Sequence, residues 1–197
     1  MAVTVEHDKR RQKILDKALT VFVDDGFEAA TFQKIADRCG ITRTILYLYF
    51  KNKREIFTYS IKQLLLNAEE KIKLICADES LNSIEKITGV LSSILKLLEH
   101  NRKLLSVVID YLLHVSKGDV NPDERVRRRT VRLRHILSSI VIEGVKSGEL
   151  KKIKIKTLHD SLYSFIESAI FQLVILKRKD INELKDSIVL TVKQFAA

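Results

Sequence analysis

Residues 43–50, Arg-Thr-Ile-Leu-Tyr-Leu-Tyr-Phe, would give a short helix an unusual surface. At about 100° per residue, Leu46 and Phe50 share one side of that helix. The opposite side carries Arg43, Thr44, Tyr47 and Leu48, with Ile45 and Tyr49 flanking it. A solvated face would carry Lys and Glu, whereas arginine, tyrosine hydroxyls and apolar groups suit guanine edges, phosphates and thymine methyls in a DNA groove. The pattern therefore favours a surface that binds double-stranded DNA.

Two short helices joined by a tight turn would position this surface. Thr31 is suited to cap a helix whose inward residues include Ile35 and Ala36, and Gly40 permits the sharp turn that ends it. Thr42 is suited to cap the next helix, which carries the outward arginine and tyrosine. This stretch predicts a helix-turn-helix whose second helix enters the major groove. An ordinary helical hairpin is the alternative.

An amphipathic helix is predicted before this motif, over residues 8–25. Gly26 would take the left-handed position after its end, and Phe27 would pack back on its last turn. Four cations precede the apolar part of this helix: Lys9, Arg10, Arg11 and Lys13. They are expected to form either an arm that reaches DNA or a solvated tail.

The rest of the chain is also predicted to be helical. Its 197 residues include one Pro and six Gly, too few for the frequent turns of an all-β fold. Asn52 and Glu55 resemble a capping box at the start of a long helix. The predicted later helices cover residues 53–77, 80–99, 104–115, 122–146, 157–178 and 180–195. We therefore expect an all-α protein of about nine helices.

The composition narrows the function classes. Hydrophobic residues make up 46% and charged residues 30% of the chain, as in a soluble globular protein. The net charge of +10 suits a polyanionic partner. No apolar stretch approaches the ~20 residues of a membrane span, so we expect a soluble, cytosolic protein with no membrane partner. Cys39 and Cys76 are expected to be reduced thiols.

The sequence lacks the usual catalytic and metal-binding patterns. It has no Gly-rich phosphate loop, no His-Glu-x-x-His and no Gly-x-Ser-x-Gly. The five histidines lie far apart, without the spacing of metal ligands. The sequence therefore predicts neither an enzyme nor a bound metal or cofactor.

Over about a quarter of the chain, the residues resemble the N-terminal domain of TetR/AcrR-type transcriptional regulators. The shared positions are Ile14, Ala18, Phe22, Gly26, Phe27, Thr31, Ile35, Ala36, Gly40, Ile41, Thr42, Leu46, Tyr47, Tyr49, Phe50, Lys53 and Glu55. Cys39, Thr44 and Ile45 depart from the residues that the family often has. Thr44 and Ile45 lie on the groove side, so they affect which operator is read rather than how DNA is bound.

The resemblance implies a DNA-binding domain over residues 8–68, with its recognition motif at 31–50, and an effector-binding and dimerisation domain over residues 69–197. Each subunit of a homodimer would read half of a palindromic operator with its third helix. The last two long helices of both subunits would form a four-helix bundle. A small-molecule effector that binds in a cavity of the second domain would move the two DNA-binding domains of the dimer apart. The expected DNA contacts are Thr31, Lys34, Thr42, Arg43, Thr44, Ile45, Tyr47, Leu48, Tyr49 and Lys53.

The predicted helix 157–178 has apolar residues on more than one side, so it must be buried in a dimer or be a central core helix. The expected interface residues are Leu162, Ile166, Ile170, Leu173 and Val174.

Candidate pocket residues are Tyr111, His114, His135 and Phe171, with ordinary core residues as the alternative. The basic cluster over residues 125–134 is interpreted as a solvated face, with an acidic effector or partner as the alternative.

These observations together predict a homodimeric repressor that binds operator DNA and is released by a small, apolar ligand. One alternative is a helix-turn-helix DNA-binding or adaptor protein with no small-molecule effector. A second alternative is an all-α enzyme or carrier that retains an N-terminal three-helix unit.

Overall fold

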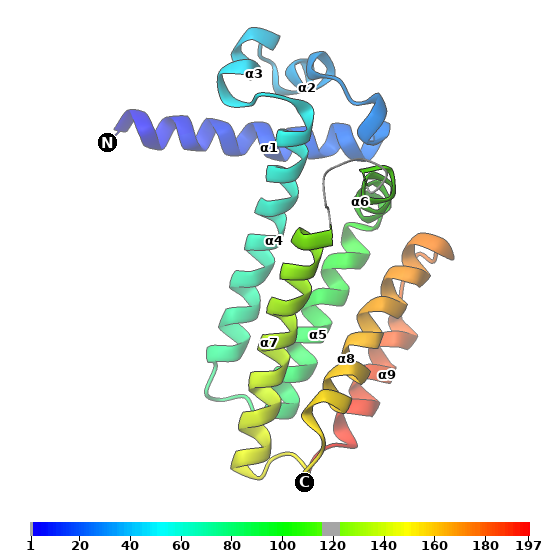
Figure 1. The fold of residues 1–197 in the computed structure, drawn as a ribbon. Coiled ribbons are helices and arrows are strands. Elements are labelled where there is room, and N and C mark those ends of the chain that lie inside the picture. The colour runs from blue at the N-terminus through cyan, green and yellow to red at the C-terminus, as the bar shows by residue number, and fades with distance from the viewer. Residues whose placement is uncertain (1, 116–122) are drawn as a thin grey trace. The chain divides into compact units, whose positions relative to one another are not determined.

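The computed structural model of the chain describes residues 2–115 and 123–197, with side chains described for residues 6–114 and 132–197 (Figure 1). Nine α-helices and one π-helical turn are present in these ranges. They are α1 (Ala2–Ala29), α2 (Phe32–Cys39), α3 (Arg43–Tyr49), α4 (Lys53–Ala77), α5 (Ser83–His100), α6 (Arg102–Val115), α7 (Asp123–Ser147), α8 (Ile155–Ile170), η1 (Phe171–Ile175) and α9 (Asn182–Lys193). The prediction of an all-α fold is confirmed. The predicted start of α7 at Pro122 lies outside the described residues.

The chain divides into two compact units. Unit 1 comprises Met1–Asn67 and Ser106–Tyr111, and unit 2 comprises Ala68–Leu105 and Leu112–Ala197. The division therefore falls inside α4, and a segment of α6 that we placed in the second domain belongs to unit 1.

A cluster of aromatic rings forms much of the core of unit 1. The ring of Phe57 in α4 lies 4.8 Å from that of Phe22 and 5.1 Å from that of Phe27, both in α1. Tyr111, from the α6 segment, packs 4.5 Å from Phe27. As predicted, α1 is interrupted at Gly26 and Phe27 packs back onto the core, but the ψ of 170° at Gly26 (φ 79°) differs from the left-handed helical position that we expected.

The core of unit 2 lies among α5, α7, α8 and α9 (Figure 1). The helices α5 and α7 approach closely at Gly144, where an added Cβ would lie 2.6 Å from Ser83 Oγ. Glu149, just after α7, accepts a hydrogen bond of 2.7 Å from the Ser83 N–H at the start of α5. A hydrogen bond from the Ser83 side chain, followed by this bond from its N–H, lowers the pKa of the Glu149 carboxyl. These contacts fix the beginning of α5 against the end of α7.

Two predicted helices differ from the observed ones. The first helix begins at Ala2, so Lys9, Arg10, Arg11 and Lys13 lie on a helix and not in a disordered tail, and their contact with DNA stays a prediction. The predicted helix over 157–178 is α-helical only to Ile170 and continues as the wide turn η1. The Leu176 N–H donates to the Phe171 carbonyl at 3.2 Å, the five-residue spacing of a π-helix. Because the predicted helix is apolar on more than one side, its sequence pattern cannot show where α-helical hydrogen bonding changes to the π-helical spacing.

Candidate nucleic-acid interface

Capping groups hold the two short helices in the predicted geometry. Thr31 Oγ1 accepts from the Lys34 N–H at 3.2 Å, and Thr42 Oγ1 accepts from the Ile45 N–H at 3.3 Å. Gly40 ends α2 in the left-handed region, with φ 69° and ψ 36°. Its N–H donates to the Asp37 carbonyl at 3.1 Å. Both ends of the turn are therefore fixed by local hydrogen bonds.

The two sides of α3 match the predicted wheel. Leu46 is fully buried and Phe50 is 1% exposed, which anchors the helix in unit 1. Tyr47 is 49% and Leu48 74% exposed, and Arg43, Thr42 and Thr44 are also exposed. A large apolar side chain with three-quarters of its surface in water is available to contact another molecule.

Arg43 and Tyr47 form one preorganised pair on this exposed side. Arg43 Nη2 donates to Tyr47 Oη at 3.0 Å, and the guanidinium lies 5.5 Å from the ring centroid. The Tyr47 ring is stacked on Phe32 of α2, with centroids 4.6 Å apart. The stack on Phe32 orients the Tyr47 ring, and the hydroxyl of Tyr47 in turn directs the guanidinium of Arg43 along the exposed side of α3. A planar donor fork held this way is suited to the O6 and N7 acceptors of guanine.

The flanking residues are less accessible. Ile45 and Tyr49 are half-buried, and Tyr49 is stacked against His7 of α1 with centroids 4.5 Å apart. Arg11 lies over the Phe50 and Tyr59 rings at 4.9 and 4.2 Å. His7 and Arg11 thus support the end of α3, a role that the sequence prediction missed. His7 and Arg11 are four residues apart and therefore share one helical face. A predicted first helix that began before His7 would have placed both residues on the same side.

Both lysines that were predicted to contact DNA are already engaged with the end of α1. Lys34 Nζ lies 3.0 Å from Asp25 Oδ2 and donates to the Ala29 carbonyl at 3.3 Å. Lys53 Nζ donates to the carbonyls of Phe27 and Glu28 at 2.9 and 2.8 Å. Lys53 Nζ also lies 3.9 Å from Glu28 Oε2, so a phosphate contact would have to compete with partners that are already in place.

The candidate pocket residues do not form an interior wall in either unit. Tyr111 belongs to the aromatic cluster of unit 1. His114, His135 and Phe171 have exposed side chains, and Phe171 is 53% exposed. Among the described residues of the 125–134 cluster, Arg132 pairs with Glu69 at 3.0 Å and Arg134 lies over the Tyr163 ring.

Three of the five expected interface residues are unavailable to a second copy. Leu162, Ile166 and Leu173 are buried in the core of unit 2 itself, which supports the core-helix alternative for this side of α8. Ile170 and Val174 are half-buried. The exposed apolar side chains lie elsewhere, with Phe171 at 53%, Ile175 at 60% and Leu190 at 65%.

The described part of the chain offers little to metals or membranes. No three His, Cys, Asp or Glu side chains gather there in a group that could hold a metal ion. None of the described helices is long and apolar enough to cross a membrane. Cys39 and Cys76 are both free thiols, and burial raises the pKa of each.

The helix-turn-helix lies in a region that matches a known family. Residues 14–59 match the model of bacterial regulatory proteins of the tetR family. The fatty acid metabolism regulator protein of Bacillus subtilis is 27% identical over 184 residues, covering 89% of this chain and 90% of that protein. The HTH-type transcriptional repressor KstR2 of Mycolicibacterium smegmatis is 28% identical over 142 residues, covering 72% of this chain and 68% of that protein.

A solved structure shares the fold across both units. It is the transcriptional regulator FadR from Bacillus subtilis in complex with stearoyl-CoA, with a TM-score of 0.70 and 23% identity, covering 91% of this chain and 96% of that one. The fold and the helix-turn-helix define a transcriptional regulator of the helix-turn-helix class. Its helix-turn-helix region, residues 14–59, is of the tetR type.

Proposed function

We propose that the protein is a repressor that binds a palindromic operator as a homodimer and is released by a small ligand with a long apolar chain. The observation that carries DNA binding is the exposed side of α3, where Arg43 is held by Tyr47 and Leu48 is 74% exposed. With this set of side chains, Arg43 can donate hydrogen bonds to guanine, and Leu48 can make apolar contacts with thymine methyl groups.

The ligand class is supported by the relatives rather than by the candidate pocket residues. A fatty acid metabolism regulator aligns along most of the chain, and a protein of the same fold holds stearoyl-CoA. A long acyl chain needs an apolar enclosure, and the core of unit 2 is built almost wholly of Leu, Ile and Val side chains. We therefore propose a long-chain acyl thioester as the ligand.

The proposed dimer surface is the outward side of η1 and α9. Phe171, Ile175 and Leu190 expose more than half of their apolar surface in the single chain. Covering them with the same surface of a second copy would remove apolar area from water around a two-fold axis. Two recognition helices would then meet half-sites about 34–36 Å apart.

A gel-shift assay against the DNA upstream of the protein's own gene tests the proposal. We expect a discrete complex that Arg43→Ala weakens and that micromolar stearoyl-CoA dissociates. Native mass spectrometry should show the bound acyl-CoA. A complex that forms but does not respond to acyl-CoA, with no adduct in the mass spectrum, would favour a helix-turn-helix protein without an effector.

Sedimentation of Phe171→Glu tests the dimer surface. The side chain is exposed in the single chain, so the variant should fold but sediment as a monomer and lose most of its operator affinity. The matched control is Leu74→Glu, since Leu74 is 72% exposed on α4, away from η1 and α9. A Phe171→Glu protein that stays dimeric would rule out this surface.

A further inference from the structure

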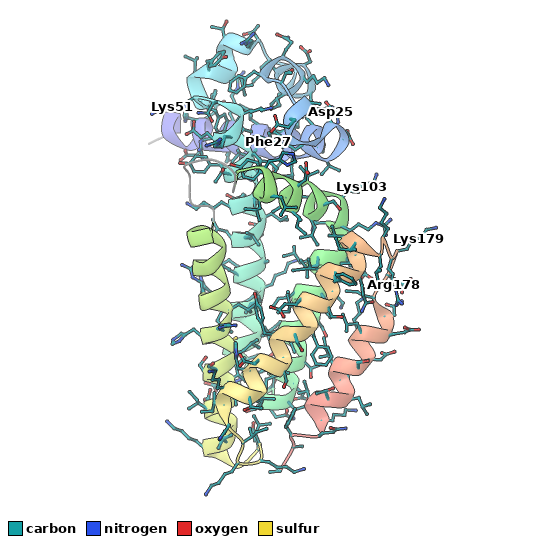
Figure 2. The ribbon with its side chains drawn as sticks, turned by 45° about the vertical axis from the view of Figure 1, so that its right-hand side comes forward. Asp25, Phe27, Lys51, Lys103, Arg178 and Lys179 are labelled. Carbon is teal, nitrogen blue, oxygen red and sulfur yellow. The ribbon has the colours of Figure 1, made fainter. Side chains whose placement is uncertain are left out.

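Five basic residues gather in unit 2 where η1 ends, and we call them the cationic corner. They are Arg102 and Lys103 in the first turn of α6, and Lys177, Arg178 and Lys179 between η1 and α9. Arg102 Nη1 donates to the Lys179 carbonyl at 2.7 Å, which ties the two segments together across 77 positions of sequence. Figure 2 draws Lys103, Arg178 and Lys179 in this part of the molecule.

Apart from Arg102, the positive charges of the corner are only partly neutralised by ion pairs. Arg178 lies 3.6 Å from Glu183, whose side chain is 92% exposed. The nearby carboxylate of Glu99 is held by Lys185 at 2.7 Å, so it is not free to balance the corner. Within the described residues, the ammonium groups of Lys103, Lys177 and Lys179 have no carboxylate within 4.0 Å.

The backbone holds these cations in a fixed arrangement. The Arg178 N–H donates to the Gln172 carbonyl at 3.0 Å, and Arg178 Nη1 lies 3.4 Å from Gln172 Oε1. Lys177 has φ 52°, the only positive φ of a residue other than glycine in the described chain. A lysine in the left-handed region persists only where surrounding contacts fix it, and such positions cluster at ligand sites.

Like charges held close together repel each other, and a polyvalent anion relieves this repulsion. Leu176, directly before the corner, is 52% exposed and adds apolar surface beside the cations. An acyl thioester of a phosphate-bearing carrier combines an apolar chain with several phosphate charges. We propose that the cationic corner binds the phosphate groups of the carrier while the acyl chain is held by the apolar part of unit 2. This inference rests on the proposed function, because it names the part of the same ligand that the corner recognises.

Titration of the full chain with stearoyl-CoA, free CoA and stearic acid tests the inference. In the double variant Lys103→Glu/Lys179→Glu, the dissociation constant for stearoyl-CoA should rise roughly tenfold or more, because two attractive charges become repulsive. Affinity for stearic acid should change less than twofold. The matched control is Lys152→Glu/Lys156→Glu, which makes the same charge change at exposed lysines of unit 2 away from the corner. Circular dichroism checks that both variants are folded.

The outcomes separate the inference from the proposed function. A selective loss of stearoyl-CoA in the corner variant, together with a salt-dependent affinity in the parent protein, supports the corner. Equal affinity of the corner variant and the parent protein for stearoyl-CoA overturns the corner but leaves the acyl ligand intact. Equal losses in both double variants also overturn it, since they indicate a general charge effect. A parent protein that binds no acyl-CoA overturns both the ligand class and the corner.

Discussion

Lys53 closes the end of α1 by contacting Phe27 in two ways. Its Nζ donates to the Phe27 carbonyl at 2.9 Å and lies 4.7 Å from the centroid of the Phe27 ring. A further hydrogen bond of 2.8 Å reaches the Glu28 carbonyl. Carbonyls at the end of a helix have no intrahelical partner, and a cation there also interacts well with the helix dipole. Lys53 is therefore a structural link between α4 and the end of α1.

Lys53→Met should destabilise unit 1 by about 1–3 kcal/mol, because two carbonyls lose a charged donor. Urea unfolding followed by circular dichroism measures this loss. Lys51→Met is the control, since Lys51 is exposed and only its backbone N–H is engaged. Unchanged stability combined with a salt slope of DNA binding that falls by about one unit would instead restore the phosphate role predicted from the sequence.

Arg43 and Tyr47 should contribute to operator binding to different degrees. Arg43→Ala should lower operator affinity by a factor corresponding to ~1–3 kcal/mol, because a bidentate contact with guanine is lost. Tyr47→Phe keeps the stack on Phe32 but removes the hydroxyl that orients the guanidinium, so its loss should be smaller, about 0.5–1.5 kcal/mol.

Competition of the operator with random DNA measures both effects. Lys152→Ala, a charge removal in unit 2, is the control and should leave the ratio of operator to random affinity unchanged. Equal binding of the operator by Arg43→Ala and the parent protein would reject α3 as the recognition helix.

Local signals explain why the helix-turn-helix could be predicted and the rest of the site could not. Thr31, Gly40 and Thr42 act on backbone groups within four residues, so their types and spacing predict their roles. The acceptors of Lys53 lie 25 and 26 positions away, and no local pattern marks them. Tyr111 likewise joins unit 1 only through the tertiary fold.

The sequence also could not predict which side of α8 is buried in the core. Leu162 and Phe171 are both large and apolar, yet Leu162 is fully buried and Phe171 is 53% exposed. Hydrophobicity cannot assign them to the core or to a second copy, because both environments are apolar. The wide turn at η1 then changes the register after Ile170, so the faces of the predicted helix do not continue unchanged.

Gly26 and Gly40 should respond differently to substitution by asparagine. Gly40 has φ 69° and ψ 36°, a left-handed conformation that asparagine tolerates, so Gly40→Asn should cost little. Gly26 has φ 79° and ψ 170°, a region that is almost restricted to glycine. Since nothing lies within 4 Å of an added Cβ at either position, the cost is conformational.

We expect Gly26→Asn and Gly26→Ala to lower the free energy of unfolding by about 1–3 kcal/mol. Urea unfolding of the three variants measures the difference. Gly40→Asn also serves as the control that asparagine itself is harmless, and it should retain operator binding. Equal tolerance of asparagine at both positions would contradict a glycine-specific conformation at Gly26.

Glu99 should make the stability of unit 2 depend on pH. Its carboxylate, at the end of α5, accepts from Lys185 Nζ at 2.7 Å and from the Ile181 N–H at 3.2 Å, and these bonds hold its pKa below the ordinary value of 4.5. A carboxyl whose pKa is lowered by folding stabilises the fold above its unfolded pKa, and the stabilisation is lost as pH falls through the folded pKa. Glu99→Gln should therefore lower the free energy of unfolding by about 1–2 kcal/mol near pH 7 and progressively less below the ordinary carboxyl range.

Urea unfolding of the parent protein and of Glu99→Gln between pH 7 and about 3 measures this difference. Glu183→Gln removes the same charge from a side chain that is 92% exposed, so its effect should be small at every pH. A cost of Glu99→Gln that stays constant as pH falls would show that the amide disturbs packing and that the charge of Glu99 is not the stabilising group.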